Sequence, residues 1–290
     1  WYKKRNTYEL GFGGVRGDGM SGINGIFSSK EINNINLRIN KMNEAIAHRG
    51  PDYSASLIIN NNVAFGHANL NTSNRNSTIL QPLTDKKNRW TILLDGTIYN
   101  SRNLIKHNNS KTSNLSDAEI ILDYLDRYGI KRLLNDLEGD YAICLYDKNQ
   151  HRVYLIQDKI GVRPLYYMLD SEKLIFSSEI KGILSSGLIE PQFYEDAIDE
   201  YLGYRYTRAP YTFFKNIYKV KAGELIIIDK HFNLYRETYW ELPYEFNYNK
   251  NYDEGKVLYE FKELLINSIK KRAISEVQVG TYLSGGVDSS

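Results

Sequence analysis

The chain has 290 residues, a length that suits about two domains of ordinary size. Its 37 basic and 35 acidic residues leave a formal net charge of +2, which excludes the strong field that favours nucleic acid or a membrane surface. No apolar run approaches the roughly 18 residues of a membrane-spanning helix, and the single cysteine, Cys144, excludes an internal disulfide framework and fits a reducing cytosol.

The first 19 residues differ in character from the rest of the chain. They begin at Trp1, lack hydrophobic periodicity and end in a Gly- and Arg-rich stretch at 11–19. They contain no apolar segment of the kind that marks a signal peptide. We interpret residues 1–19 as a non-native or disordered leader with the true start at Met20, and a genuine disordered extension is the alternative.

Short apolar runs alternate with two helical patterns over most of the chain. Apolar residues spaced by four, three and four positions predict a helix that contains Ile35, Ile39, Met42 and Ile46. Turn-forming residues at 48–52 then end this helix. Strands are predicted at 22–27, 56–60, 63–67, 90–94, 141–146, 153–157, 173–177 and 224–228. We expect the strand at 90–94 to turn at Asp95-Gly96.

The second helical pattern carries its own start and stop signals. Ser116 is followed three residues later by Glu119, the capping-box spacing, and Gly129 is a typical residue just after a helix end. A helix is therefore predicted over 116–128. Mixed strands with two clear helices favour an α+β layered domain, which we place at 20–241.

The remainder of the chain predicts the beginning of another domain. Residues 242–252 are polar and aromatic and are interpreted as a linker. From Asp253 onward, an amphipathic helix leads into an apolar run at 277–283 that predicts a buried strand. Helix, strand and glycine-rich loop together are typical of the opening of an α/β domain, at 253–290.

The last seven residues carry the most specific chemical signal. A Gly-rich turn that leaves a strand can present backbone N–H groups to an anion, and a carboxylate beside it can hold a divalent cation. This loop resembles the pyrophosphate loop of ATP-pyrophosphatases, and the resemblance implies ATP and Mg²⁺, with Asp288 as a metal ligand. The chain ends inside the motif, so we expect it to be part of a longer protein. The candidate ATP- and pyrophosphate-binding residues are Leu283, Ser284, Gly285, Gly286, Asp288, Ser289 and Ser290.

Several segments, taken in order, resemble the glutamine-dependent asparagine synthetase family. The matching stretches are 20–23, 48–52 (His-Arg-Gly-Pro-Asp), 95–100, 116–119, 137–142, 158–167 and 176–179, followed by the terminal loop. The resemblance implies an N-terminal-nucleophile glutaminase domain with a four-layer αββα sandwich, followed by the truncated start of an ATP-pyrophosphatase domain. In such proteins one site releases ammonia from glutamine, and the other adenylates a carboxylate that the ammonia attacks.

The chain departs from this family in the implied glutamine pocket. Ser21 occupies the position of the nucleophilic cysteine, and a hydroxyl is the weaker nucleophile. Asn69 stands where the family has an arginine that binds the glutamine carboxylate, and Thr97 replaces a glutamate. Asp95 replaces an asparagine that donates to the oxyanion, and losing one such donor typically costs about 10²–10³ in rate. Gly96 and Asp117, the implied contact of the substrate ammonium group, are kept.

These observations predict an ATP-dependent, amide-forming ligase of the asparagine synthetase family whose glutaminase half is inactive. The partners implied are a carboxylate (aspartate, a peptide or a β-amino acid) and ammonia or an amine; the location is the cytoplasm, and a homodimer is compatible with the family. Alternatives are a macrolactam or β-lactam synthetase-like cyclase, a glutamine-hydrolysing asparagine synthetase that uses a serine nucleophile, or a catalytically inactive regulatory homologue. The 290-residue chain alone is expected to be inactive.

Overall fold

A computed structural model describes residues 21–70, 80–107, 115–244, 253–272 and 285–287. In chain order the elements are β1 (Gly22–Ser28), α1 (Ile35–Ala45), β2 (Tyr53–Asn60), β3 (Val63–Asn69), β4 (Leu83–Thr84), β5 (Trp90–Ile98), α2 (Ser101–His107), α3 (Asp117–Asp136), β6 (Gly139–Asp147), β7 (Arg152–Gln157), β8 (Tyr166–Leu169), β9 (Lys173–Ser177), α4 (Ile180–Ser185), α5 (Asp196–Tyr204), β10 (Tyr218–Lys219), β11 (Glu224–Ile228), β12 (Leu234–Thr238) and α6 (Glu254–Arg272). All the predicted strands up to 224–228 are present, although several are longer than expected.

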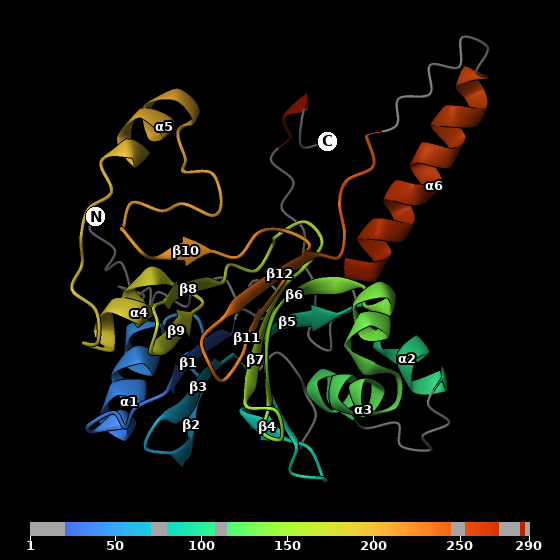
Figure 1. Ribbon diagram of the computed structural model, residues 1–290. Coiled ribbons are helices and arrows are strands. Elements are labelled where there is room, and N and C mark those ends of the chain that lie inside the picture. The colour runs from blue at the N-terminus through green and yellow to red at the C-terminus, as the bar shows by residue number, and fades with distance from the viewer. Residues whose placement is uncertain (1–20, 71–79, 108–114, 245–252, 273–284, 288–290) are drawn as a thin grey trace, which may run out of the picture.

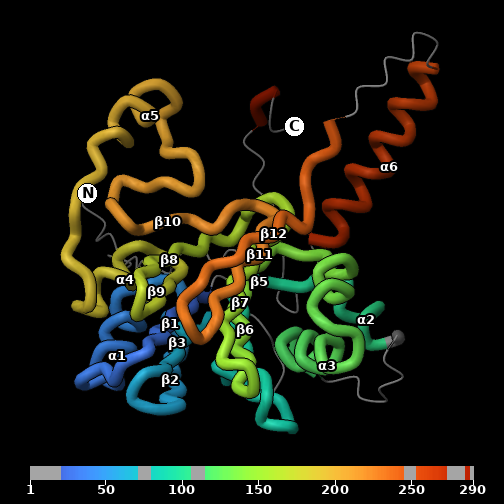
Figure 2. The backbone as a smooth tube through the Cα atoms, viewed as in Figure 1, coloured from blue at the N-terminus to red at the C-terminus, as the bar shows by residue number. Residues whose placement is uncertain are grey.

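Within the described ranges, the strands form two antiparallel sheets of six strands each. The first sheet has the order β10-β8-β9-β1-β3-β2, and the second has the order β12-β11-β7-β6-β5-β4. Strand β1 lies in the middle of the first sheet, where Gly22 pairs with Ala68 of β3 and Asn24 pairs with Ser177 of β9. Figure 2 shows that β1 and β5, which are distant in sequence, lie close together at the centre of the molecule.

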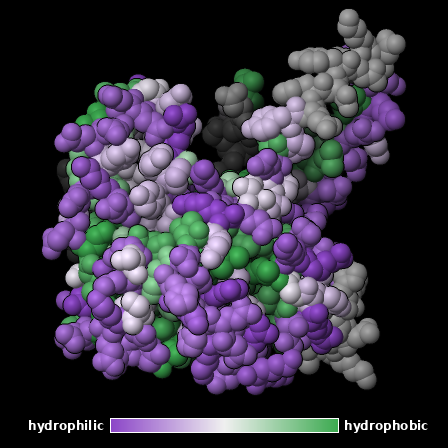
Figure 3. All heavy atoms as spheres, viewed as in Figure 1, coloured by the Kyte–Doolittle hydropathy of each residue, from purple (hydrophilic) through white to green (hydrophobic). Residues whose placement is uncertain are grey.

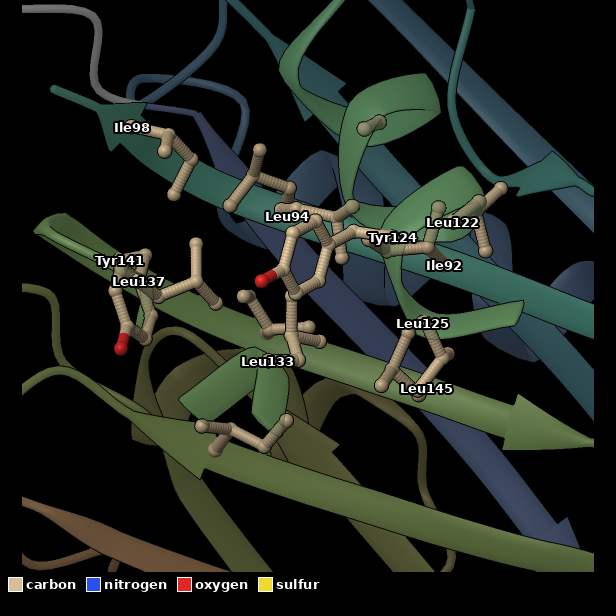
Figure 4. Close-up of a cluster of buried hydrophobic side chains, with 14 of the residues drawn as sticks. Ile92, Leu94, Ile98, Leu122, Tyr124, Leu125, Leu133, Leu137, Tyr141 and Leu145 are labelled. Carbon is tan, nitrogen blue, oxygen red and sulfur yellow. The ribbon is translucent and has the colours of Figure 1, made fainter. Parts of the chain in front are cut away.

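The two sheets are sandwiched between two layers of helices (Figure 1). Helices α1 and α4 cover the outer face of the first sheet, through a core that includes Ile39, Met42 and Ile183. Helices α2 and α3 cover the outer face of the second sheet, through a core that Figure 4 shows between α3 and strands β5 and β6. A third core, which includes Phe65 and Phe176, fills the space between the sheets. The described part of the chain is therefore a four-layer αββα sandwich, as predicted.

The two helical patterns are confirmed, with one difference at a glycine. Ile35, Ile39, Met42 and Ile46 are all buried, as their spacing predicts. Ser116 caps α3 in a full capping box with Glu119. At Gly129 the backbone leaves the helical region with a φ of 76°, so the first helical segment of α3 ends at this glycine as predicted, and a second helical segment follows across the kink to Asp136.

The predicted turn at Asp95-Gly96 is wrong, because β5 continues straight through these residues to Ile98. Asp95 pairs with Ala142 and Gly96 with Tyr141 in the register of β5 and β6. Gly96 has a φ of 136°, and a side-chain carbon at this position would collide with the carbonyl oxygen of Asp140. A glycine therefore permits an unusually close approach of the two strands where a turn was expected.

Helix α6 begins where predicted and has no buried side chain. Most of its apolar residues are at least 48% exposed, Ile266 is intermediate between buried and exposed, and Figure 3 shows hydrophobic atoms on this helix at the surface. None of the helices among the described residues is long and apolar enough to cross a bilayer. The strand predicted at 277–283 and most of the linker at 242–252 lie outside the described residues.

Candidate active site

Ser21 lies at the start of β1, in the layer between the two sheets, and is only 8% exposed. Its backbone N–H donates to Oδ1 of Asp95 at 3.1 Å, and its carbonyl oxygen accepts from Nε of Arg49 at 2.8 Å. Its hydroxyl oxygen lies 3.5 Å from the backbone N–H of Leu70, at the outer limit for a hydrogen bond. Both backbone groups of the candidate nucleophile are therefore held by charged side chains.

Asp95 reaches Ser21 from the neighbouring sheet and is fully buried. Its Oδ2 accepts from a terminal nitrogen of Arg49 at 2.7 Å and from the hydroxyl of Ser178 at 3.3 Å. Burial raises the pKa of the Asp95 carboxyl above its ordinary value, and the positive charges of Arg49 and Arg163 oppose that rise. The Asp95 carboxylate therefore accepts hydrogen bonds from Ser21, Arg49 and Ser178.

Arg49 comes from the turn that follows α1 and is 6% exposed. The turn is closed by the Arg49 N–H, which donates to the carbonyl oxygen of Ile46 at 2.9 Å. The next residue, Gly50, presses against β3, where any side chain would collide with the backbone of Ala68. The close approach of this turn to the sheet directs Arg49 to Asp95 and the Ser21 carbonyl.

An outer group of charged residues continues the network toward the surface. Glu179 lies 3.6 Å from Arg49, 2.7 Å from Nε2 of His48 and 3.2 Å from Nζ of Lys181. Partial burial acts to raise the pKa of Glu179, but hydrogen bonds from His48 and Lys181 hold it below its ordinary value. Glu179 occupies the N-cap position of α4 without a capping hydrogen bond from its side chain, so its side chain serves the ion-pair network.

The structure brings the six predicted pocket positions to one end of the sandwich. Asn69 ends β3, beside Leu70, whose N–H faces Ser21. Gly96 and Thr97 follow Asp95 along β5, and Asp117, the first residue of α3, accepts from the N–H of Ile98 at 2.9 Å. Of these positions, Asp95 contacts Ser21 directly, and Asn69 is adjacent in sequence to Leu70, whose N–H faces the Ser21 hydroxyl.

Sequence reasoning missed two residues of this site, Arg49 and Ser178, and did not connect His67 to it. Arg49 belongs to the segment 48–52, which was interpreted as a turn. The only sequence signal for its place in the site was a basic residue just after the end of a predicted helix. Ser178 donates to Asp95 and accepts from the N–H of Ile23 at 3.0 Å. His67 donates from Nε2 to the carbonyl oxygen of Leu94 at 3.3 Å across the two sheets, and burial lowers its pKa to about 4.

The predicted nucleotide loop is described only at residues 285–287. Gly285 has a φ of 75° and open space around it, which suits a glycine-rich turn. The other loop positions lie outside the described residues: Leu283, Ser284, Asp288, Ser289 and Ser290. Within the described ranges, no three histidine, cysteine, aspartate or glutamate side chains gather in a way that could hold a metal ion. Cys144 is fully buried, and burial raises its pKa, as expected for a core residue.

The four-layer αββα sandwich has the fold of N-terminal-nucleophile, class II glutamine amidotransferases. Two solved structures share the fold. The glutamine phosphoribosylpyrophosphate amidotransferase from Bacillus subtilis, complexed with ADP and GMP, has a TM-score of 0.54 and 18% identity over 75% of this chain and 49% of that chain. The allosteric regulatory enzyme of purine biosynthesis has a TM-score of 0.56 and 18% identity over 78% of this chain and 50% of that chain.

The sequence matches narrow the class to a family. A glutamine amidotransferase domain model matches residues 20–240, and an asparagine synthase model matches residues 260–290. The chain belongs to the glutamine amidotransferase domain family, and the resemblance to glutamine-dependent asparagine synthetases is confirmed.

Named relatives support the same assignment over most of this chain. A putative asparagine synthetase [glutamine-hydrolyzing] 2 from Methanocaldococcus jannaschii is 35% identical over 93% of this chain and 56% of its own length. Asparagine synthetase [glutamine-hydrolyzing] 2 from Bacillus subtilis is 30% identical over 86% of this chain and 34% of its own length. The amidase chry2 from Gibberella zeae is 29% identical over 85% of this chain and 37% of its own length. The chain thus spans from about a third to just over half of these relatives.

Proposed function

We propose that this chain is the N-terminal part of an ATP-dependent, amide-forming ligase of the asparagine synthetase type, whose glutaminase half does not release ammonia. The observation that carries the proposal is the buried carboxylate of Asp95, held against the Ser21 backbone by Arg49. This arrangement supports the loss of glutamine hydrolysis. The family matches nevertheless cover both the glutaminase part at 20–240 and the beginning of the synthase part at 260–290.

The loss of glutamine hydrolysis follows from the donors that the reaction needs. When a nucleophile attacks an amide, negative charge develops on the amide oxygen, and preorganised hydrogen-bond donors must stabilise it. Asp95 has only acceptor oxygens when ionised, and the Arg49 side chain is engaged with Ser21, Asp95 and Glu179. Asn69 brings no positive charge for a substrate carboxylate. The ion pair with Arg49 reduces the expected repulsion between the Asp95 carboxylate and the developing oxyanion. Position 95 nevertheless supplies no hydrogen-bond donor to that oxyanion.

The ligase half of the proposal is supported by the asparagine synthase match at 260–290. The backbone N–H groups of the loop at 284–290 would hold the pyrophosphate of ATP, and Asp288 would hold Mg²⁺. ATP, when bound, would activate a carboxylate as an acyl-adenylate. The positive φ of Gly285 fits such a loop, because glycine reaches that conformation at little cost.

The substrate class is a carboxylate, either aspartate or the carboxylate of a peptide or β-amino acid, together with ammonia or an amine. An internal amine, as in macrolactam and β-lactam synthetases, would make a glutamine-derived ammonia supply unnecessary. The matches at 20–240 and 260–290 support the proposed division into 20–241, a linker at 242–252 and a second domain from 253. The single, buried Cys144 supports a cytoplasmic location.

The test uses the full-length protein that contains both halves. ATP–pyrophosphate exchange is measured with aspartate and with a panel of other carboxylates, and AMP release is then compared with ammonium and with glutamine as nitrogen source. The proposal predicts exchange with at least one carboxylate and AMP release that responds to ammonium or an added amine but not to glutamine. Exchange with no carboxylate would instead favour a catalytically inactive regulatory homologue.

A further inference from the structure

Asp95 and Arg49 form a closed ring of contacts with the backbone of Ser21. Asp95 binds its N–H at 3.1 Å, Arg49 binds its carbonyl at 2.8 Å, and the two side chains bind each other at 2.7 Å. The two charged side chains are 0% and 7% exposed. Electrostatic interactions at such a depth are screened far less than at the surface, so the pair sets the potential that the Ser21 side chain experiences.

The net charge of this pair is zero, and that balance has a chemical consequence. A lowered pKa of a hydroxyl or thiol nucleophile and the stabilisation of an oxyanion are both favoured by positive potential at the nucleophile. Arg49 alone would provide it, since its guanidinium contacts the Ser21 carbonyl directly. We propose that Asp95 is the residue that switches off the Ser21 position, by neutralising Arg49 while it holds the Ser21 backbone. This inference rests on the proposed loss of glutaminase activity and names the residue responsible for it.

Isosteric substitutions of the two partners separate this role from a merely structural one. Asp95→Asn removes the negative charge nearest to Arg49, whose other acidic neighbour, Glu179, lies farther away at 3.6 Å, so an anion at position 21 becomes more stable. Arg49→Gln removes the hydrogen-bonded positive charge and leaves only the field of Arg163 to oppose Asp95, so the same anion becomes less stable. Both variants disturb the fold in the same sense, because each leaves a buried charge without its partner. Only an electrostatic role predicts shifts of opposite sign.

The experiment reads the potential with a thiol at position 21 of the 290-residue chain. In Ser21→Cys, the rate of alkylation by iodoacetamide is followed against pH, which gives the pKa of the new thiol. Cys144, fully buried and with a raised pKa, stays unreactive in the folded protein. Adding Asp95→Asn should lower the pKa of the introduced thiol by about one unit and speed alkylation near neutral pH roughly tenfold, and adding Arg49→Gln should slow it roughly tenfold.

A matched control uses another buried aspartate that pairs with an arginine. Asp147 is 1% exposed on its side chain and binds Arg89 at 2.8 Å, but it lies at the end of β6, opposite Trp90 and away from Asp95. Asp147→Asn in the Ser21→Cys background should leave the alkylation profile unchanged. The combined Arg49→Gln and Asp95→Asn variant, with no net change in charge, should return the profile to that of Ser21→Cys alone.

Two results would overturn the inference: shifts of the same sign from the two single substitutions, or no shift from either. Circular dichroism establishes that each variant is folded. If the Asp95→Asn protein does not fold, Arg49→Gln is compared with the combined Arg49→Gln and Asp95→Asn variant, in which the added Asp95→Asn should reverse the shift. Glutamate release by the wild-type protein is a separate matter. It would contradict the proposed function while leaving the alkylation shifts as predicted, so the two failures are distinguishable.

Discussion

Two buried aspartate–arginine pairs lie along the β5–β6 ladder, with Asp147 at its end and Asp95 within it, and their surroundings differ. Asp147 pairs with Arg89 at 2.8 Å, and Arg89 is 36% exposed. Asp95 pairs with Arg49 at 2.7 Å, and neither side chain is more than 7% exposed. The same two functional groups thus occur once at the rim of the sandwich and once in its interior, beside the candidate nucleophile.

The remaining contacts of the two aspartates explain the difference. Asp147 accepts from the N–H groups of Asn149 and Gln150, and so builds the hairpin turn between β6 and β7. Arg89 also stacks on the ring of Trp90, 4.9 Å from its centroid. Asp95 builds no turn and binds Ser21 instead. A buried ion pair is therefore informative about function only when its other contacts are not already explained by local structure.

The largest difference in stability between the two ion pairs is expected when the arginine of each pair is replaced. Arg49→Met leaves the Asp95 carboxylate buried without its partner and should lower the free energy of unfolding by about 3–5 kcal/mol. Arg89→Met should cost about 1 kcal/mol, because Arg89 is partly solvated and Asp147 keeps its backbone donors. Urea denaturation of both variants measures the two losses, and equal losses would contradict the distinction.

The pH dependence of stability should reflect the buried His67 beside the candidate site. Burial lowers the pKa of His67 from 6.5 to about 4, so the unfolded chain binds a proton in this range that the folded protein does not. The stabilisation is fully present above about pH 6.5 and is lost as the pH falls toward 4, by about 3 kcal/mol in total.

The variant His67→Gln keeps a donor for the Leu94 carbonyl and should remove this part of the acid destabilisation. Denaturation midpoints measured from about pH 7 to pH 4 give the comparison. A His67→Gln protein as acid-sensitive as the wild type would show that His67 is not the group responsible.

Two glycines with positive φ should respond differently to alanine. Gly96→Ala brings a methyl group against the Asp140 carbonyl and should cost about 2–3 kcal/mol, through strain and separation of β5 from β6. Gly129→Ala at the kink of α3 meets open space, so only backbone strain of about 1–2 kcal/mol opposes it. Thermal unfolding of the two variants tests the ordering, and a smaller loss for Gly96→Ala would mean that the strands separate easily there.

The smallest effect is expected at the outer edge of the site. Glu179→Gln weakens the contacts with His48 and Lys181, whose side chains are about half exposed, and should change stability by less than about 1 kcal/mol. Its comparison is Glu172→Gln, in the exposed pair with Lys30. The change in the free energy of unfolding of both variants is measured from denaturant midpoints. A decrease for Glu179→Gln as large as that for Arg49→Met would show that Glu179 contributes to stability as strongly as the buried pair does.

Local patterns predicted local structure well in this chain. The spacing of Ile35, Ile39 and Met42 located α1, and the Ser116–Glu119 pair located the start of α3, because both depend on residues within a few turns of one helix. The turn expected at Asp95-Gly96 was wrong because the conformation of Gly96 is determined by the neighbouring strand β6.

The residues of the candidate site were predicted from motifs, whereas the ion pair that holds Asp95 in place was not. Motif resemblance named Ser21, Asn69, Asp95 and Asp117, which the fold brings to one end of the sandwich. The partnership of Asp95 with Arg49 was not predicted, since the two are 46 positions apart and meet only when a turn on one sheet reaches a strand of the other. Long-range pairs of this kind depend on packing that no local pattern encodes.

The central claim is that the surroundings of Ser21 no longer support glutamine hydrolysis. Its most direct test is glutamate release from glutamine by the full-length protein, measured for the wild type and for Ser21→Ala under the same conditions. We predict that neither protein releases glutamate above the uncatalysed rate and that the two are indistinguishable. Rapid release by the wild type that Ser21→Ala abolishes would contradict the account.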